Sequence, residues 1–149
     1  MKTLGKVLSI NISEKKGVVK KPIEQGIFIE EHGLEGDAHA GKWHRQVSLL
    51  AEESIDKIKK LGIEGLDYGK FAENITTEGI VLYELPVGTR LSIGETIQEV
   101  TQIGKECHQG CEIRNLVGDC VMPREGIFTR VIKGGVVRVG DSINILNLY

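Results

Sequence analysis

One stretch of this sequence has the periodicity of an α-helix, and the segments around it are short and strand-like. In residues 51–61, Glu52 and Glu53 lie early and three lysines lie late, an order that suits the helix dipole. Apolar residues recur there at helical spacing, and Gly62 is suited to end the helix. A chain with a single amphipathic helix must build its core mainly from sheets.

Strand-like segments fill most of the remaining chain. Gly5–Ser13 alternates apolar and polar residues, and Thr96–Ile103 is rich in β-branched residues. The 19 glycines against 3 prolines favour tight turns between strands. The pattern predicts a mainly β fold that is compact and barrel-like, with one clear α-helix and short helical turns near 111–117. Further strands are expected at 27–29, 46–50, 71–77, 127–132 and 142–146.

Two finer features follow from local patterns. Residues 87–97 and 135–143 resemble each other, because each reads as a strand, a turn of glycine and an acidic residue, and a second strand. This predicts a short hairpin unit that is used twice. Near the N-terminus, Val18 and Val19 are predicted to begin a strand that Pro22 interrupts.

Composition excludes several classes of function. The formal net charge is −2 and aromatic residues make up 5% of the chain, which argues against a nucleic-acid-binding surface. No apolar run approaches the roughly 20 residues that span a bilayer. The first residues become polar too soon for a signal peptide. We therefore expect residues 1–149 to form one cytoplasmic domain that binds neither nucleic acid nor membrane.

All three cysteines lie in one segment, residues 104–124, directly after a predicted strand. An odd number of cysteines in a reducing compartment argues against a disulfide framework. Cys107 lies beside Lys105 and His108, whose positive charge would favour the thiolate form of this cysteine. Such a thiolate could carry sulfur, attack an electrophile or bind a soft metal.

The same segment allows a different interpretation. Cys107, His108, Cys111 and Cys120 could hold a structural zinc ion, which would make the chain a non-enzymatic β-barrel binding domain. The gap between Cys111 and Cys120 is unusual for zinc. Cys120 precedes apolar Val121, so simple burial is the alternative for that cysteine.

A glycine-rich loop at residues 36–45 is a second candidate region. Asp37 could orient His39, and Arg45 is suited to clamp a phosphate or carboxylate through two hydrogen bonds. The alternative is a surface loop with a partly packed Trp43.

Arg124 is a further candidate anion ligand. Pro123 fixes the backbone just before it. The alternative here is a β-turn with a solvated pair between Arg124 and Glu125.

Several motifs occur in one order along the chain. They are Gly-Asp-Ala-His-Ala-Gly at 36–41, Arg-Gln-Val at 45–47, Phe-Ala-Glu-Asn-Ile-Thr at 71–76, Glu-Val-Thr-Gln at 99–102, Cys107, and Gly-Ile-Phe-Thr-Arg-Val-Ile at 126–132. This set resembles the MOSC family, the domain shared with the C-terminus of molybdenum cofactor sulfurases. The resemblance implies a compact, strand-rich, barrel-like fold with a cleft.

The resemblance also implies a site. Cys107 would be the sulfur carrier or the molybdenum ligand, and the cofactor would be molybdopterin-type, with zinc as the alternative described above. Orienting or anion-binding groups would come from Asp37, His39, Arg45, Asn74, Lys105 and Arg124. The implied partners are a sulfur donor such as a cysteine desulfurase and the enzymes of molybdenum cofactor biosynthesis.

The segment before Cys107 departs from the family pattern. Many members have Arg-x-Pro before the cysteine, whereas this chain has Gly104, Lys105 and Glu106 and adds Cys111. This variant is similar to small stand-alone MOSC proteins, and it lacks the N-terminal β-barrel domain of the cofactor reductases. A module that binds the cofactor or transfers sulfur is therefore expected over a complete reductase, with sulfur transferase and molybdenum-dependent reductase component as the two enzymatic alternatives.

Overall fold

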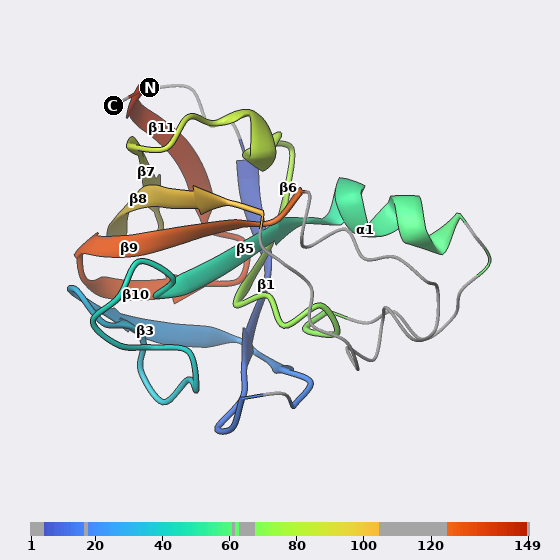
Figure 1. Ribbon diagram of the computed structural model, residues 1–149, viewed down its shortest axis with the longest axis horizontal. Coiled ribbons are helices and arrows are strands. Elements are labelled where there is room, and N and C mark those ends of the chain that lie inside the picture. Colours follow the sequence, from blue (N-terminus) through green and yellow to red (C-terminus); the bar gives the residue numbers. More distant parts are fainter. Residues whose placement is uncertain (1–4, 17, 61, 63–67, 105–124, 149) are drawn as a thin grey trace.

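The computed structural model describes residues 5–16, 18–60, 62, 68–104 and 125–148 (Figure 1). Its elements are β1 (Gly5–Ile12), β2 (Lys21–Ile23), β3 (Gln25–Ile29), β4 (Gly33–Leu34), β5 (Val47–Ala51), α1 (Glu52–Lys59), β6 (Ile75–Glu78), a 3-10 turn η1 (Leu82–Glu84), β7 (Thr89–Ile93), β8 (Thr96–Ile103), β9 (Ile127–Lys133), β10 (Gly135–Arg138) and β11 (Ser142–Leu148). The predicted mainly β fold with one clear helix is confirmed. The helical turns expected near 111–117 lie outside the described residues.

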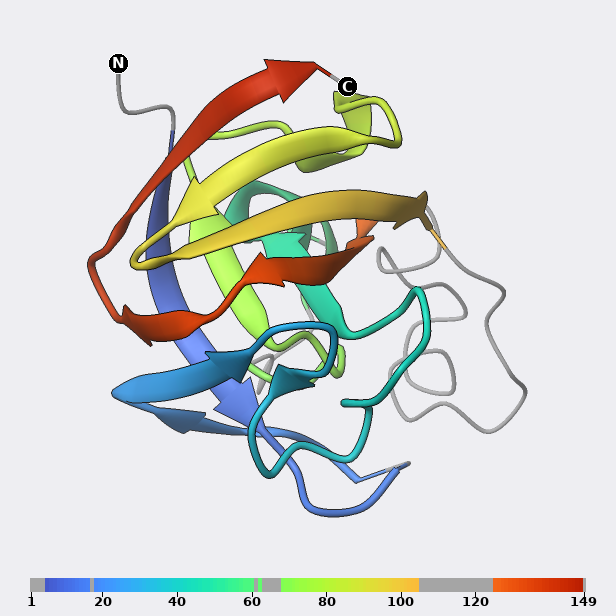
Figure 2. The same cartoon turned by 90° about the vertical axis from the view of Figure 1, so that its left-hand side faces the viewer.

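Seven strands close into a barrel. Their order is β11, β7, β8, β9, β5, β6 and β1, and β1 pairs back with β11 at Gly5 and Lys6 (Figures 1 and 2). Neighbouring strands in the ring are antiparallel except β5 and β6, which are parallel. That parallel pair requires a crossover connection, which contains α1.

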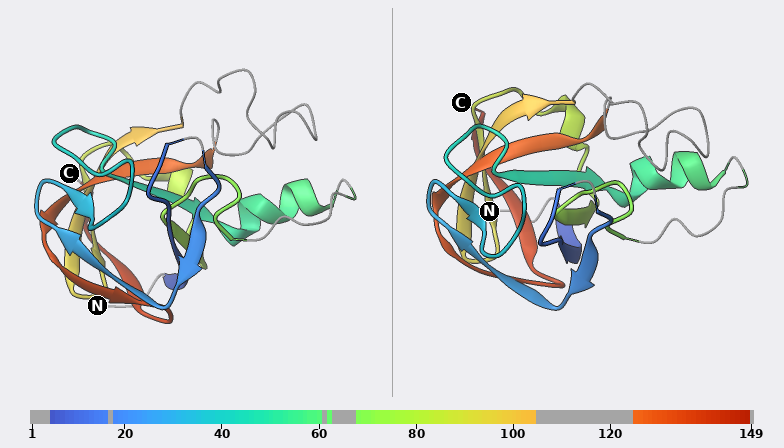
Figure 3. Two further views of the ribbon diagram at one scale, coloured as in Figure 1. Left: turned by 90° about the horizontal axis from the view of Figure 1, so that it is seen from below. Right: turned by 60° about the horizontal axis from the view of Figure 1, so that its bottom comes forward.

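The core lies inside this ring and follows the alternation of the strands. On β7, Leu91 and Ile93 are fully buried, and Val100 on β8 is nearly so. All five residues of β5 are buried, and α1, whose Ile55 and Ile58 are buried, packs beside β5 and β6. Figures 1 and 3 show α1 extending to one side of the barrel. Among the described residues, no helix has the length and apolarity to cross a bilayer.

A second, three-stranded sheet of β10, β3 and β4 corrects the expectation of two hairpins. β7 and β8 do form the first one. The second strand–turn–strand unit is not a hairpin, because β10 pairs with β3 while β11 pairs with β7 and β1. Gly135 opposes Phe28 in the small sheet, whereas Ile143 opposes Ile93 in the barrel. The similar local sequences therefore serve two different sheets.

The prediction that a strand begins at Val18 is also wrong. The strand begins at Lys21, and Pro22 is tolerated because β2 pairs with β1 at the end of the strand order. Lys20 lies just before the strand, and its side chain is fully buried. Gly69, with φ of +91°, holds its backbone so close to the Lys20 carbonyl that a side chain at residue 69 would clash with it.

Candidate functional site

A buried ion pair anchors the loop that follows β4. The Lys20 ammonium lies 2.7 Å from Asp37 Oδ1, and both side chains are fully inaccessible. Asp37 Oδ1 also accepts from the Ser13 amide, and Oδ2 accepts from the His39 amide, each at 3.1 Å. Burial raises the pKa of Asp37, but the hydrogen bond and charge of Lys20 outweigh it, so the pKa lies below its ordinary value. Asp37 is therefore a carboxylate that ties the loop to the end of β1.

His39 joins this pair at the protein surface. Its Nδ1 lies 3.1 Å from Lys20 Nζ, and its side chain is 32% exposed. The indole of Trp43 donates to the His39 carbonyl at 2.8 Å. The structure therefore places Asp37 and His39 next to each other in the loop after β4.

Asn74 belongs to the scaffold beneath this region. Its side-chain oxygen accepts from the Ser48 amide at 3.0 Å, and its side-chain nitrogen donates to the Asn11 carbonyl at 3.2 Å. Asn74 is fully buried, and its amide is one of the groups that lower the pKa of Asp37. Asn74 thus joins β5 to β1 and supports the ion pair from within.

Arg45 is held by a second cluster at the protein surface. Its Nε donates to Gln102 Oε1 at 3.1 Å, and His44 Nε2 lies 2.9 Å from the same oxygen. The guanidinium carbon lies 6.0 Å from the ring centre of Trp43 and 5.3 Å from that of Phe128. These contacts fix the direction of the guanidinium group.

Gln102 connects Arg45 to the end of β8. Because an arginine can only donate, the Gln102 oxygen must face Arg45, and its amide nitrogen donates to the Gly104 carbonyl at 2.7 Å. Gly104 in turn donates its amide to the Gly126 carbonyl at 2.7 Å. Arg45 therefore lies beside the end of β8, close to Gly104.

Part of the predicted site lies outside the described residues. This applies to Lys105, Cys107 and Arg124, and also to the alternative zinc ligands His108, Cys111 and Cys120. Within the described residues, no group of three or more His, Cys, Asp or Glu side chains could hold a metal ion.

Lys20 and Gln102 are two site residues that sequence reasoning missed. Gln102 was visible only as part of the Glu-Val-Thr-Gln motif, where nothing marks its amide as a bridge. The sequence signal for Lys20 was its position directly after apolar Val18 and Val19. That position does not distinguish a buried lysine from an exposed one.

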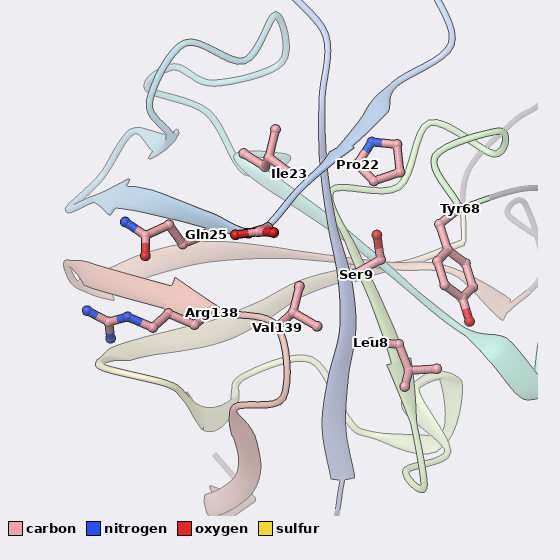
Figure 4. A pocket seen from close by; sticks show the side chains of 9 residues that line it. Leu8, Ser9, Pro22, Ile23, Gln25, Tyr68, Arg138 and Val139 are labelled. Atoms are coloured by element: carbon pink, nitrogen blue, oxygen red, sulfur yellow. The ribbon is translucent and has the colours of Figure 1, made fainter.

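A cleft of about 610 Å³ lies elsewhere in the described structure (Figure 4). It opens beside β1 between β2 and the β10–β11 turn. Of the predicted site residues, the four that the structure describes do not line it. Its lining residues are Leu8, Ser9, Pro22, Ile23, Glu24, Gln25, Tyr68, Arg138 and Val139.

The closed barrel and the loop at residues 36–45 define a class of small β-barrel domain. Comparison with known proteins identifies the family. The MOSC domain family matches residues 36–144. The chain therefore belongs to the MOSC domain family, as its motifs predicted. The matched range contains every predicted site residue but not Lys20.

Solved structures share the fold. The YUAD protein from Bacillus subtilis is 21% identical, with a TM-score of 0.78, covering 95% of this chain and 96% of that chain. YiiM from Geobacillus stearothermophilus is 18% identical, with a TM-score of 0.75, covering 96% of this chain and 75% of that chain. YiiM from Escherichia coli is also 18% identical, with a TM-score of 0.66 and coverages of 99% and 70%. No curated protein sequence matches this chain.

Proposed function

We propose that this MOSC protein binds the molybdenum cofactor or transfers sulfur to it, with Cys107 as the reacting thiol. The observation that carries the proposal is the bridge from Arg45 through Gln102 to Gly104. Cys107 follows Gly104 by three residues, a connection that spans at most about 11 Å. This closeness along the chain supports the proposal that Arg45 and the Cys107 thiol act on the same ligand.

The described donors fit the anionic part of such a cofactor. Arg45 has a fixed guanidinium that is suited to a phosphate, and His39 adds a partly exposed ring on the same loop. Lys105 and Arg124 are proposed to add positive charge. When bound, the cofactor would supply a metal centre for sulfur or oxygen exchange, and the Cys107 thiolate is the soft ligand that such a metal prefers.

The buried residues have a supporting role in this proposal. Asp37 and Asn74 have no exposed polar atom to offer a ligand, since both are engaged by the scaffold. They orient the loop that carries His39 and Arg45. Cys107 itself either carries a persulfide received from a donor such as a cysteine desulfurase or ligates molybdenum directly.

Elemental analysis tests the proposal. The chain would be purified from a host that makes the cofactor, as wild type, Cys107→Ala and the matched control Cys120→Ala. We expect molybdenum and pterin in the wild type and the control, with the metal at least tenfold lower in Cys107→Ala. Persulfide labelling at Cys107 would separate the sulfur-carrier version from the ligand version.

Two outcomes would contradict the proposal. One is the absence of molybdenum, pterin and persulfide from the wild type. The other is one zinc ion per chain that is lost in both cysteine variants, which would favour the zinc-binding alternative.

A further inference from the structure

We infer that Lys16 and Trp43 complete a phosphate-binding site with Arg45. Lys16 supplies a second positive charge, and Trp43 is the ring against which both cations lie. The inference rests on the proposed function, in which Arg45 faces the anionic part of the ligand, and it deepens that function by naming two further ligand-binding residues. Lys16 lies before the matched range of residues 36–144 and in none of the motifs of the chain.

The ring of Trp43 has two cations beside it. Lys16 Nζ lies 5.6 Å from the ring centre, and the guanidinium carbon of Arg45 lies 6.0 Å from it. Two like charges repel each other, and the attraction of each cation to the ring partly offsets this repulsion. Trp43 therefore gathers positive charge at one place on the surface, where a bound anion would neutralise it.

Trp43 is itself held in place. Its amide donates to the Gly41 carbonyl at 3.0 Å, and its indole nitrogen donates to the His39 carbonyl at 2.8 Å. The residue nevertheless remains 38% exposed. The ring is thus fixed by the loop that carries it and is still accessible to a ligand.

The turn that carries Lys16 is attached to this loop. The Ala38 amide donates to the Ser13 carbonyl at 2.8 Å, and the Ser13 amide donates to Asp37 Oδ1 at 3.1 Å. Lys16 follows Ser13 by three residues and is exposed. The two hydrogen bonds keep the turn beside the loop, while the long side chain of Lys16 can move to meet a ligand.

Unused donors and unbalanced charge indicate the ligand class. Arg45 donates from Nε to Gln102, and in the part of the chain that the structure describes its two terminal nitrogens make no hydrogen bond and neither Arg45 nor Lys16 has an ion pair. Asp37, the only acidic residue of the loop at 36–45, is buried against Lys20. Two cations with donors to spare suit an oxyanion with two negative charges, which is a phosphate monoester.

Tryptophan fluorescence tests the inference, because Trp43 is the only tryptophan of the chain. The whole chain, purified from a host that does not make the cofactor, would be titrated with inorganic phosphate and with chloride at equal ionic strength. We expect a saturable change with phosphate and none with chloride. Lys16→Gln should weaken phosphate binding about tenfold, whereas the matched control Lys15→Gln should change it less than about twofold. Calorimetry would give the same affinities independently of the fluorescence.

Three results would overturn the inference. They are the absence of saturable phosphate binding by the wild type in both measurements, equal affinities in wild type and Lys16→Gln, and equal losses in Lys16→Gln and Lys15→Gln. The last would mean that any surface lysine of this turn attracts the anion. The titration needs no molybdenum, whereas elemental analysis decides the proposed function, so the two can fail separately.

Discussion

Asp37 and Glu73 are two buried carboxyl groups with opposite surroundings. Asp37 meets the charge of Lys20, and its pKa is lowered. Glu73 is fully buried, but its hydrogen bonds come from the neutral Phe71 amide and the Thr76 hydroxyl. Burial is the largest effect on Glu73, and its pKa is raised. The comparison teaches that burial alone does not decide whether a carboxyl group in this barrel is charged. Asp37 stays charged because a cation is buried beside it, whereas the hydrogen-bond donors to Glu73 are neutral.

Asp37→Asn is expected to have the largest effect on the contrast between Asp37 and Glu73. The substitution removes the carboxylate that neutralises Lys20, so we expect the free energy of unfolding to fall by about 3–5 kcal/mol. Urea unfolding at neutral pH measures it. The double variant Lys20→Met with Asp37→Asn serves as the control, because it removes the buried ammonium while the side-chain oxygen can still accept from a backbone amide, and it should recover much of the loss. A loss below about 1 kcal/mol in Asp37→Asn would show that the ion pair is not essential.

Asn74→Asp is expected to have the next largest effect. It removes the donor to the Asn11 carbonyl and places a second carboxylate near Asp37. We expect a loss of about 1–3 kcal/mol in the free energy of unfolding, since a buried acceptor is left unsatisfied. Ser9→Ala is a suitable control, because it removes one buried hydrogen bond to Asn11 and leaves both bonds of the Asn74 side-chain amide in place. If the two variants lose the same stability, the amide of Asn74 has no special role.

Glu73→Gln should have a smaller effect on stability. The amide keeps an acceptor for the Phe71 amide and can donate to the Thr76 hydroxyl. We expect a change within about 1 kcal/mol by urea unfolding, against the much larger loss in Asp37→Asn. An equally large loss in both isosteric variants would mean that Glu73 is charged and specifically compensated.

The dependence of stability on pH gives the finest test. The lowered pKa of Asp37 contributes stability that is present above its ordinary value of 3.8 and is lost as the pH falls below it. The raised pKa of Glu73 contributes stability below its ordinary value of 4.5 that is lost as the pH rises above it. The difference between wild type and Asp37→Asn should therefore shrink below pH 3.8, whereas Glu73→Gln should gain on wild type above pH 4.5. Unfolding curves across this range would contradict the comparison if both variants changed in the same direction.

The fold was largely predictable because alternation reports which face of a strand is buried. β8 occupies the predicted range of residues 96–103, and α1 lies within the predicted range of 51–61. Pairing was harder to predict, since the similar segments 87–97 and 135–143 pair with different partners. In the site, the motif containing Asp37 and His39 pointed to a real cluster. Its third member, Lys20, comes from a separate segment that only the folded chain brings near.

Closure of the barrel joins strands from opposite ends of the described chain. β1 meets β11 at Gly5 with Ile143 and at Lys6 with Ser142, whereas β7 and β8 are adjacent in sequence. Bringing distant segments together costs more conformational entropy than forming a local hairpin. The β7–β8 hairpin can therefore form early during folding, and the β1–β11 contact is expected to form among the last. Refolding intermediates of this chain would then be open sheets, with the edges of β1 and β11 exposed to pairing with other molecules.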